Sequence, residues 1–210
     1  MAIFGEDPRC PYCNQQLDKT PARKVKCPHC GEFIYVRQGK LITEEEAQIS
    51  EWLGYLDQFD ITRSKFDQER KKLSERFKTK ASVHDTVWSI LNKWVGSHPA
   101  QRSVEFAYRE MARLLSQEGK DCNHLIESAL TAQLQFYKIR KVKNVIVQNY
   151  GGRGDNIDTC PQCAELHGKK FTIDEALNKM PIPRNCTSDF ECRCYYEPAT
   201  IEEEVLLIDS

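Results

Sequence analysis

The chain has 210 residues, with 30 Lys and Arg against 31 Asp and Glu, and 40% of its residues are hydrophobic. The formal charge of −1 excludes a uniformly basic coat protein for nucleic acid, and the length suits one or two domains. No stretch approaches the ~18 apolar residues that cross a bilayer, and the first residues do not form a signal peptide. We therefore expect a cytoplasmic or virion-associated protein without membrane contact.

The ten cysteines are clustered toward the two ends of the chain. Four lie within residues 10–30, five lie within residues 160–194, and Cys122 stands alone. In a cytoplasmic protein such clusters indicate metal binding before disulfide bonds. The distribution divides the chain into a small N-terminal module, a cysteine-poor middle and a C-terminal module.

The first cluster has the spacing of a four-thiolate zinc site. Cys10-Pro-Tyr-Cys13 and Cys27-Pro-His-Cys30 are two C-x2-C knuckles, and each can direct two thiolates at one tetrahedral Zn²⁺. The 13 residues between them are long enough for a β-hairpin, and Gly31 relieves the turn after the last ligand. This motif resembles the zinc-ribbon family. A rubredoxin-like iron site has the same four ligands and is the alternative.

Basic side chains follow the first knuckle, and aromatic side chains lie close to them in the sequence. Interleaved cations and rings are typical of surfaces that bind nucleic acid, although a solvated face of a zinc-dependent mini-domain is the alternative. The candidate contacts are Lys19, Arg23, Lys24 and Lys26.

The middle of the chain is predicted to be helical, because apolar residues recur there every three or four positions. Thr43 and Glu46 form a capping box, Ser82 caps a third helix, and Pro99 suits the first turn of a fourth. We expect this region to offer a surface for a protein partner or for self-association. The five expected helices span about 43–56, 62–77, 82–95, 99–115 and 121–140.

The C-terminal module is expected to begin with a strand over 142–148 and a loop over 151–156. Cys160-Pro-Gln-Cys163 is a third knuckle, which needs two more donors from Cys186, Cys192 and Cys194. Cys192 and Cys194 could face one side of a strand, but more than one ligand spacing apart. We therefore expect only one of them to join Cys160, Cys163 and Cys186. His167 is a reserve donor, and two disulfide bonds are the competing interpretation.

The order of these residues resembles the C-terminal segment of phage Mu F-like head morphogenesis (minor head) proteins. The similarity covers residues 142–198 and depends on the knuckle, on His167-Gly168-Lys169 and on Cys192-Arg193-Cys194. The family's distal group reads His-Pro-Asn-Cys-Arg-Cys, whereas Cys186 here has no His-Pro before it. The resemblance implies a small zinc-stapled α/β module of phage or prophage origin, in which Cys186 replaces that histidine.

Motifs for catalysis are missing from the sequence. It contains no His-Glu-x-x-His, no Gly-x-Ser-x-Gly and no phosphate loop, and four-thiolate zinc sites leave no position for substrate. We predict no catalytic residues and a zinc-binding adaptor or assembly protein of phage type, with two Zn²⁺ ions and a macromolecular partner. A nucleic-acid-binding regulator that uses the ribbon is one alternative. A metal-dependent nuclease with an open site at His167 is the other.

These interpretations give a mainly α fold, with a helical middle between an N-terminal β zinc ribbon and a small C-terminal α/β module. The predicted domains are a zinc ribbon at 1–40, a helical domain at 41–141 and a cysteine-rich zinc module with an acidic tail at 142–210.

Overall fold

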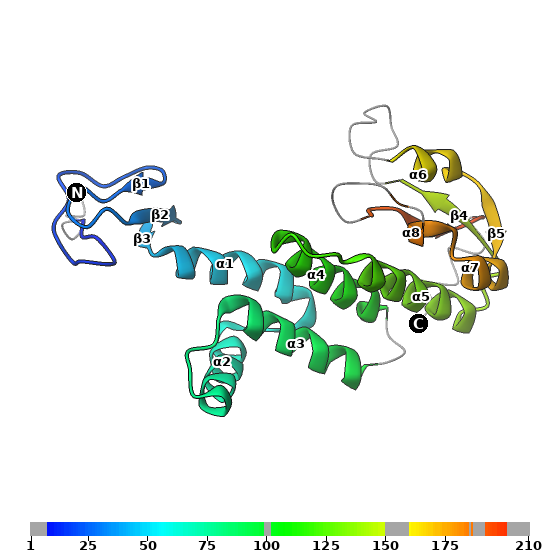
Figure 1. Ribbon diagram of the computed structural model, residues 1–210, viewed down its shortest axis with the longest axis horizontal. Coiled ribbons are helices and arrows are strands. Elements are labelled where there is room, and N and C mark those ends of the chain that lie inside the picture. Colours follow the sequence, from blue (N-terminus) through cyan, green and yellow to red (C-terminus); the bar gives the residue numbers. More distant parts are fainter. Residues whose placement is uncertain (1–7, 99–101, 150–159, 185, 187–191, 201–210) are drawn as a thin grey trace, which may run out of the picture. The chain divides into compact units, whose positions relative to one another are not determined.

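The computed structural model describes residues 8–98, 102–149, 160–184, 186 and 192–200. These residues are mainly helical, with a small antiparallel sheet toward each end of the chain, which confirms the predicted fold class (Figure 1). The chain divides into two compact units, residues 1–87 and 88–210, and the boundary falls inside helix α3 (Val83–Ser97). The three-domain division remains a prediction.

The first unit begins with a sheet of three short strands in the order β1-β2-β3. Val25 pairs with Ile34 across the second knuckle, and an isolated bridge joins Arg9 to Gln16 across the first. The hairpins therefore close around the knuckles and not within the spacer, because each knuckle itself reverses the chain. The strands are β1 (Val25–Lys26), β2 (Phe33–Arg37) and β3 (Lys40–Ile42).

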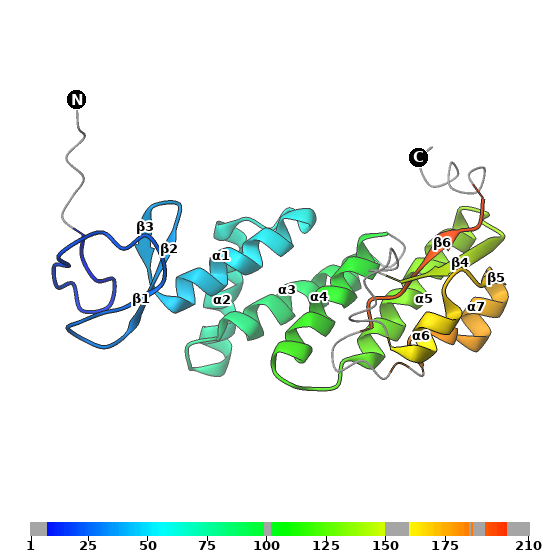
Figure 2. The same ribbon diagram turned by 90° about the horizontal axis from the view of Figure 1, so that it is seen from above.

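Helix α1 (Glu44–Leu56) follows β3 directly (Figure 2). The hydroxyl of Thr43 accepts the backbone N–H of Glu46 at 3.2 Å, as the predicted cap requires. The Glu46 carboxylate does not complete the capping box. It accepts instead from the guanidinium of Arg63 at 2.7 Å, because this first residue of α2 (Arg63–Phe77) lies within reach of a bidentate pair.

The remaining elements of this unit start where the sequence indicates. Thr62 caps α2 (Arg63–Phe77), and the Ser82 hydroxyl accepts the N–H of Asp85 at 3.0 Å at the start of α3 (Val83–Ser97). A short 3-10 helix, η1 (Asp57–Phe59), joins α1 to α2. Its Phe59 is fully buried, as are Ile49 and Leu56 of α1.

The second unit is built on α4 (Ser103–Gln117) and α5 (Asn123–Ile139), which pack against each other. Their buried faces include Ala107, Leu114 and Leu130, which follow the expected helical spacing. Helix α4 begins four residues after Pro99, and Pro99 itself lies outside the described residues.

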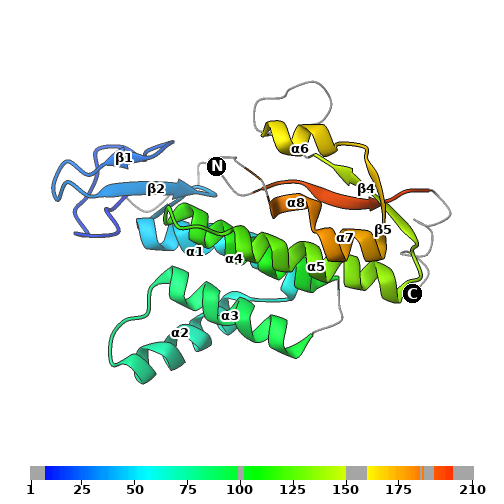
Figure 3. The ribbon, with the colours of Figure 1, turned by 45° about the vertical axis from the view of Figure 1, so that its right-hand side comes forward.

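A three-stranded antiparallel sheet in the order β5-β4-β6 completes this unit. Helix α5 lies beside this sheet (Figure 3) and contacts β6. The Tyr137 hydroxyl of α5 donates to the Tyr196 carbonyl of β6 at 3.1 Å. The loop expected over 151–156 lies outside the described residues. The elements are β4 (Asn144–Gln148), α6 (Pro161–Leu166), β5 (Lys170–Thr172), α7 (Ile173–Lys179), α8 (Pro181–Arg184) and β6 (Tyr195–Pro198).

Candidate metal centres

The two N-terminal knuckles share one backbone design. The N–H of Asn14 donates to the Cys10 carbonyl at 2.9 Å, and the N–H of Gly31 donates to the Cys27 carbonyl at 3.0 Å. Both donors have left-handed backbone angles, with φ of 59° at Asn14 and 81° at Gly31. Gly31 was expected in this role. Asn14 was not, although asparagine is among the residues that tolerate this conformation best.

The four N-terminal sulfur atoms have the spacing of a tetrahedral metal site. The Sγ atoms of Cys10 and Cys30 lie 3.8 Å apart, and those of Cys13 and Cys27 lie 3.9 Å apart. All four lie within 4.8 Å of one another. A disulfide would need about 2.05 Å. Four Zn–S bonds of about 2.3 Å give sulfur–sulfur edges of about 3.8 Å, which the observed distances match.

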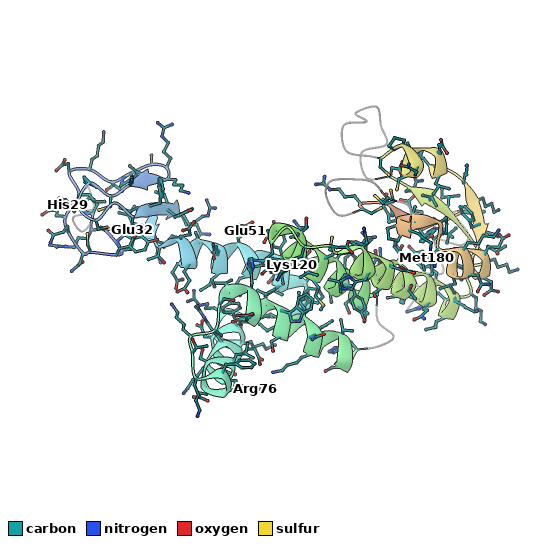
Figure 4. All side chains as sticks on the ribbon, viewed as in Figure 1. His29, Glu32, Glu51, Arg76, Lys120 and Met180 are labelled. Atoms are coloured by element: carbon teal, nitrogen blue, oxygen red, sulfur yellow. The ribbon has the colours of Figure 1, made fainter. Side chains whose placement is uncertain are left out.

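The cysteines also form part of the small core of the ribbon. Cys10 and Cys27 are buried with Leu17 and Ile34, so two of the four fully buried side chains in this cluster are thiols. Such a core cannot hold three short strands by apolar burial alone. His29, inside the second knuckle, is exposed and lies outside the sulfur group (Figure 4).

Ionisation differs among these thiols. The backbone N–H of Cys30 is the main cause that lowers the pKa of Cys27 to about 6. A hydrogen bond from the Glu32 backbone lowers the pKa of Cys30, but desolvation and the three neighbouring thiols outweigh it and raise that pKa to about 12. Four adjacent thiols therefore cannot all ionise unless a cation compensates their charge.

The C-terminal cysteines come from three segments that are separate in the sequence. Cys160 is the N-cap of α6, where its Sγ accepts the N–H of Cys163 at 3.4 Å, and Cys163 lies within the helix. Cys186 follows α8, while Cys192 and Cys194 precede β6. The last two were expected on a strand, but β6 begins only at Tyr195.

The sulfur distances repeat those of the ribbon. The Sγ atoms of Cys160 and Cys186 lie 3.7 Å apart, and those of Cys163 and Cys192 lie 3.8 Å apart. In both clusters, therefore, each sulfur of a knuckle has a distal sulfur at one tetrahedral edge. None of the ten cysteines, all of which lie among the described residues, forms a disulfide bond in this structure.

The five C-terminal cysteines form two overlapping groups. Cys160, Cys163 and Cys186 form one, and Cys163 with Cys192 and Cys194 forms the other, with the sulfur atoms of each group within 4.8 Å of one another. The wide separation expected between Cys192 and Cys194 is therefore wrong. It assumed an extended strand, whereas residues 192–194 lie before β6 in irregular backbone.

Cys194 has a partner that the sequence did not indicate. Its Sγ donates to Oδ1 of Asn149 at 3.1 Å, and Nδ2 of the same asparagine donates to the Cys163 carbonyl at 3.2 Å. Asn149 therefore connects the end of β4 to both sides of the cluster. It lies 14 residues from Cys163 in the sequence, and no local motif identifies it.

Two further residues that could bind a metal, His167 and Cys122, lie apart from both cysteine clusters. His167, the reserve donor, is exposed at the end of α6 and belongs to none of the ligand groups found among the described residues. The open site on which the nuclease alternative depends therefore lacks its histidine. Cys122 is buried at the N-terminus of α5, also outside these groups.

The proposed nucleic-acid contacts are exposed on the ribbon. Lys24 makes cation–π contacts with two aromatic rings. Its Nζ lies 4.6 Å from the ring centroid of Phe33 and 4.4 Å from that of Tyr35. The Tyr35 hydroxyl is also 2.6 Å from Nζ, and this hydrogen bond raises the pKa of Lys24. The exposed set is Lys19, Arg23, Lys24 and Lys26.

Comparison with known proteins adds no family to this description. No family model matches the chain, and neither the curated proteins nor the solved structures contain a match. The resemblance to phage head proteins therefore has no support beyond the residues that suggested it. Among the described residues, no helix combines the length and the apolar character needed to cross a membrane.

Proposed function

We propose that this protein is a non-enzymatic adaptor or assembly protein that binds two structural Zn²⁺ ions and a macromolecular partner. The sulfur spacing carries the proposal, because both clusters contain cysteine pairs at the edge length of a tetrahedral zinc site. Sites closed by four thiolates stabilise a fold and leave no position for substrate. The phage-type role rests on the resemblance of residues 142–198.

The zinc ligands follow from these distances. In the ribbon they are Cys10, Cys13, Cys27 and Cys30. In the second site we assign Cys160, Cys163, Cys186 and Cys192, because these residues form the two short sulfur pairs. Cys194 is left to its hydrogen bond with Asn149.

The second ion would connect segments that the chain itself leaves far apart. It would tie α6 to the residue after α8 and to the residues before β6, close to where α5 packs on the sheet. Zinc binding would thus stabilise the C-terminal module directly, since ligands on separate segments gather only in the folded state. A firmly folded module of this kind suits a partner surface better than a mobile one.

Native mass spectrometry of the full chain, purified without chelator, tests the metal assignment. We expect two zinc ions per chain, one lost in Cys10→Ser, one lost in Cys160→Ser, and none lost in the control Cys122→Ser. A defined oligomer or a bound protein would support the adaptor role. A single zinc in the wild type, or iron in the ribbon, would overturn the assignment.

Nucleic-acid binding through the ribbon is the second candidate, and the setting of Lys24 favours it. Phe33, with 47% of its surface exposed, is available for base stacking beside that cation. Changing all four ribbon cations to Gln should abolish binding of a single-stranded oligonucleotide at low salt, while the zinc content stays at two.

A matched control separates this effect from net charge. Four exposed cations in the second half of α2 and at its C-cap serve as the control, and replacing them by Gln changes the formal charge by the same amount. If both quadruple variants lose binding equally, the ribbon is not the contact. The control positions are Lys71, Lys72, Arg76 and Lys78, of which Arg76 is labelled in Figure 4.

A further inference from the structure

A charged cavity of about 680 Å³ lies within the second unit, between α4, α5 and the residues before β6. Its volume falls in the range of small-molecule binding sites. Cys192 lines part of the wall, so the cavity adjoins the C-terminal cysteine cluster. Apart from Cys192, neither the zinc assignment nor the adaptor role makes use of the residues that line this cavity.

Helix α4 supplies one wall. Arg102, Phe106, Arg109 and Arg113 follow one another at intervals of three or four residues, which places them along one face of the helix. Phe106 is 36% exposed, and the Arg102 guanidinium lies 5.9 Å from the centroid of its ring. This wall therefore combines cationic groups with an accessible aromatic ring.

Two buried carboxylates orient two of these arginines. Nε of Arg109 lies 3.1 Å from Oε1 of Glu105, and Nε of Arg113 lies 3.0 Å from Oε2 of Glu110. The two glutamates are only 5% and 7% exposed. Burying ion pairs contributes little to stability, so their presence at a cavity is better explained by the positioning of the guanidinium groups.

The opposite wall adds a fourth arginine and a second aromatic ring. Arg193 lines the cavity from the segment before β6, and Tyr195 lines it from the first position of β6. The lining thus contains four guanidinium groups and two carboxylates, a formal charge of +2. A guanidinium fork matches the oxygen geometry of phosphate, and a phosphate monoester carries about −1.5 to −2 charges near neutral pH.

From this arrangement we propose that the cavity binds a small phosphate ester with a planar ring system, in the size class of a mononucleotide. Its phosphate contacts the arginines, and its ring packs against Phe106 and Tyr195. The carboxylates Glu105 and Glu110 hold Arg109 and Arg113 in place before the ligand arrives, which reduces the entropy lost on binding.

Calorimetric titration of the zinc-loaded full chain with AMP, adenosine and inorganic phosphate tests the proposal. AMP should bind with a Kd in the micromolar range, and adenosine should bind at least about tenfold more weakly, because it lacks the charge-assisted hydrogen bonds. Arg102→Gln and Arg193→Gln should each weaken the binding of AMP about tenfold or more. Lys120→Gln removes a cation of the same unit outside the cavity and should leave AMP binding unchanged (Figure 4).

A second variant tests the aromatic part of the site. Phe106→Leu should weaken the binding of AMP by about fivefold or more and leave the binding of inorganic phosphate unchanged. Only the ring system is expected to stack on this side chain. Zinc content, measured on every sample, separates this proposal from the metal assignment. If both zinc ions are present and AMP still does not bind at millimolar concentration, only the cavity proposal fails.

Other results would also overturn it. Binding of AMP that survives both arginine substitutions would place the phosphate elsewhere. Succinate binding more tightly than AMP would show a site for dicarboxylates. An oligonucleotide that binds through these arginines when AMP does not would make the cavity part of a nucleic-acid surface.

Discussion

The phenol oxygen of Tyr12 accepts the backbone N–H of Glu44 at 2.8 Å, across 32 residues of sequence. Glu44 is the first residue of α1, where backbone N–H groups have no partner inside the helix. The Tyr35 hydroxyl donates to the carboxylate of the same glutamate at 2.7 Å. Two ribbon tyrosines therefore hold the start of α1, and the ribbon and this helix form one continuous structure.

Replacing Tyr12 by Phe should lower the free energy of unfolding by about 1 kcal/mol, because one net hydrogen bond at the start of α1 is lost. Urea unfolding followed by helical circular dichroism measures the change. Phe33→Leu is the control, since Phe33 is an exposed ribbon aromatic without a hydrogen bond to lose. Equal stability of the wild type and Tyr12→Phe would show that solvent replaces the tyrosine.

Chelation should unfold the ribbon and leave most helices intact. Among the described residues, the ribbon core holds Leu17 and Ile34 besides its cysteines, with Leu41 packed against them, whereas α4 and α5 bury extended apolar faces. Amide hydrogen exchange should show the N–H groups of Cys27 and Gly31 becoming unprotected after treatment with a zinc chelator. Unchanged protection there, with zinc shown to be absent, would mean that the ribbon folds without metal.

Cys194, the last cysteine of the C-terminal cluster, should be dispensable for zinc binding. Cys194→Ser is expected to retain two zinc ions per chain, because Cys194 is hydrogen-bonded to Asn149, whereas Cys192→Ser should retain one. Native mass spectrometry distinguishes the two variants. The reverse pattern would move the fourth ligand to Cys194, which lies in the same group.

The stability of the second unit should depend on pH through Glu105. Burial raises the pKa of this carboxyl, and Arg109 offsets the effect only in part. The folded state therefore binds the proton more tightly than the unfolded chain. The stability gained is complete below the ordinary pKa of 4.5 and is lost as the pH rises through the higher folded value.

Glu105→Gln lacks this titration, so its stability relative to the wild type should rise as the pH increases from 4.5. Paired urea titrations measure the difference, and the protonation of zinc ligands, common to both proteins, cancels. The opposite slope would show that the Arg109 ion pair outweighs burial.

Local features of the fold could be predicted from the sequence, and long-range ones could not. Thr43 and Ser82 act as caps because a helix start is decided within four residues. The thiol spacing within each knuckle is equally local. The capping box of Thr172 and Glu175 at α7 had the same kind of signal in the sequence and was overlooked.

The predictions that failed, and the contacts that were not predicted, concern groups that tertiary packing brings together. The Glu46 carboxylate accepts a hydrogen bond from Arg63 of the next helix and not from the backbone N–H at the start of its own helix. Cys194 and Asn149 meet because β4 and the segment before β6 are neighbours in the sheet. The charged cavity likewise draws its lining from residues that are distant in the sequence, such as Arg109 of α4 and Arg193 before β6. No periodicity or motif in the sequence predicts such long-range pairs.

Arg109 joins the cavity to the cysteine cluster, since its Nη2 donates to the Cys194 carbonyl at 3.3 Å. A ligand that binds this arginine more tightly when the segment holds zinc would favour zinc binding, and zinc would in turn raise the affinity for that ligand by the same factor. If both sites bind as proposed, the zinc and ligand occupancies are thermodynamically linked. With that coupling, a cell's zinc supply would affect how tightly this protein binds a phosphorylated metabolite, and abundant metabolite would favour the zinc-bound form when zinc is scarce.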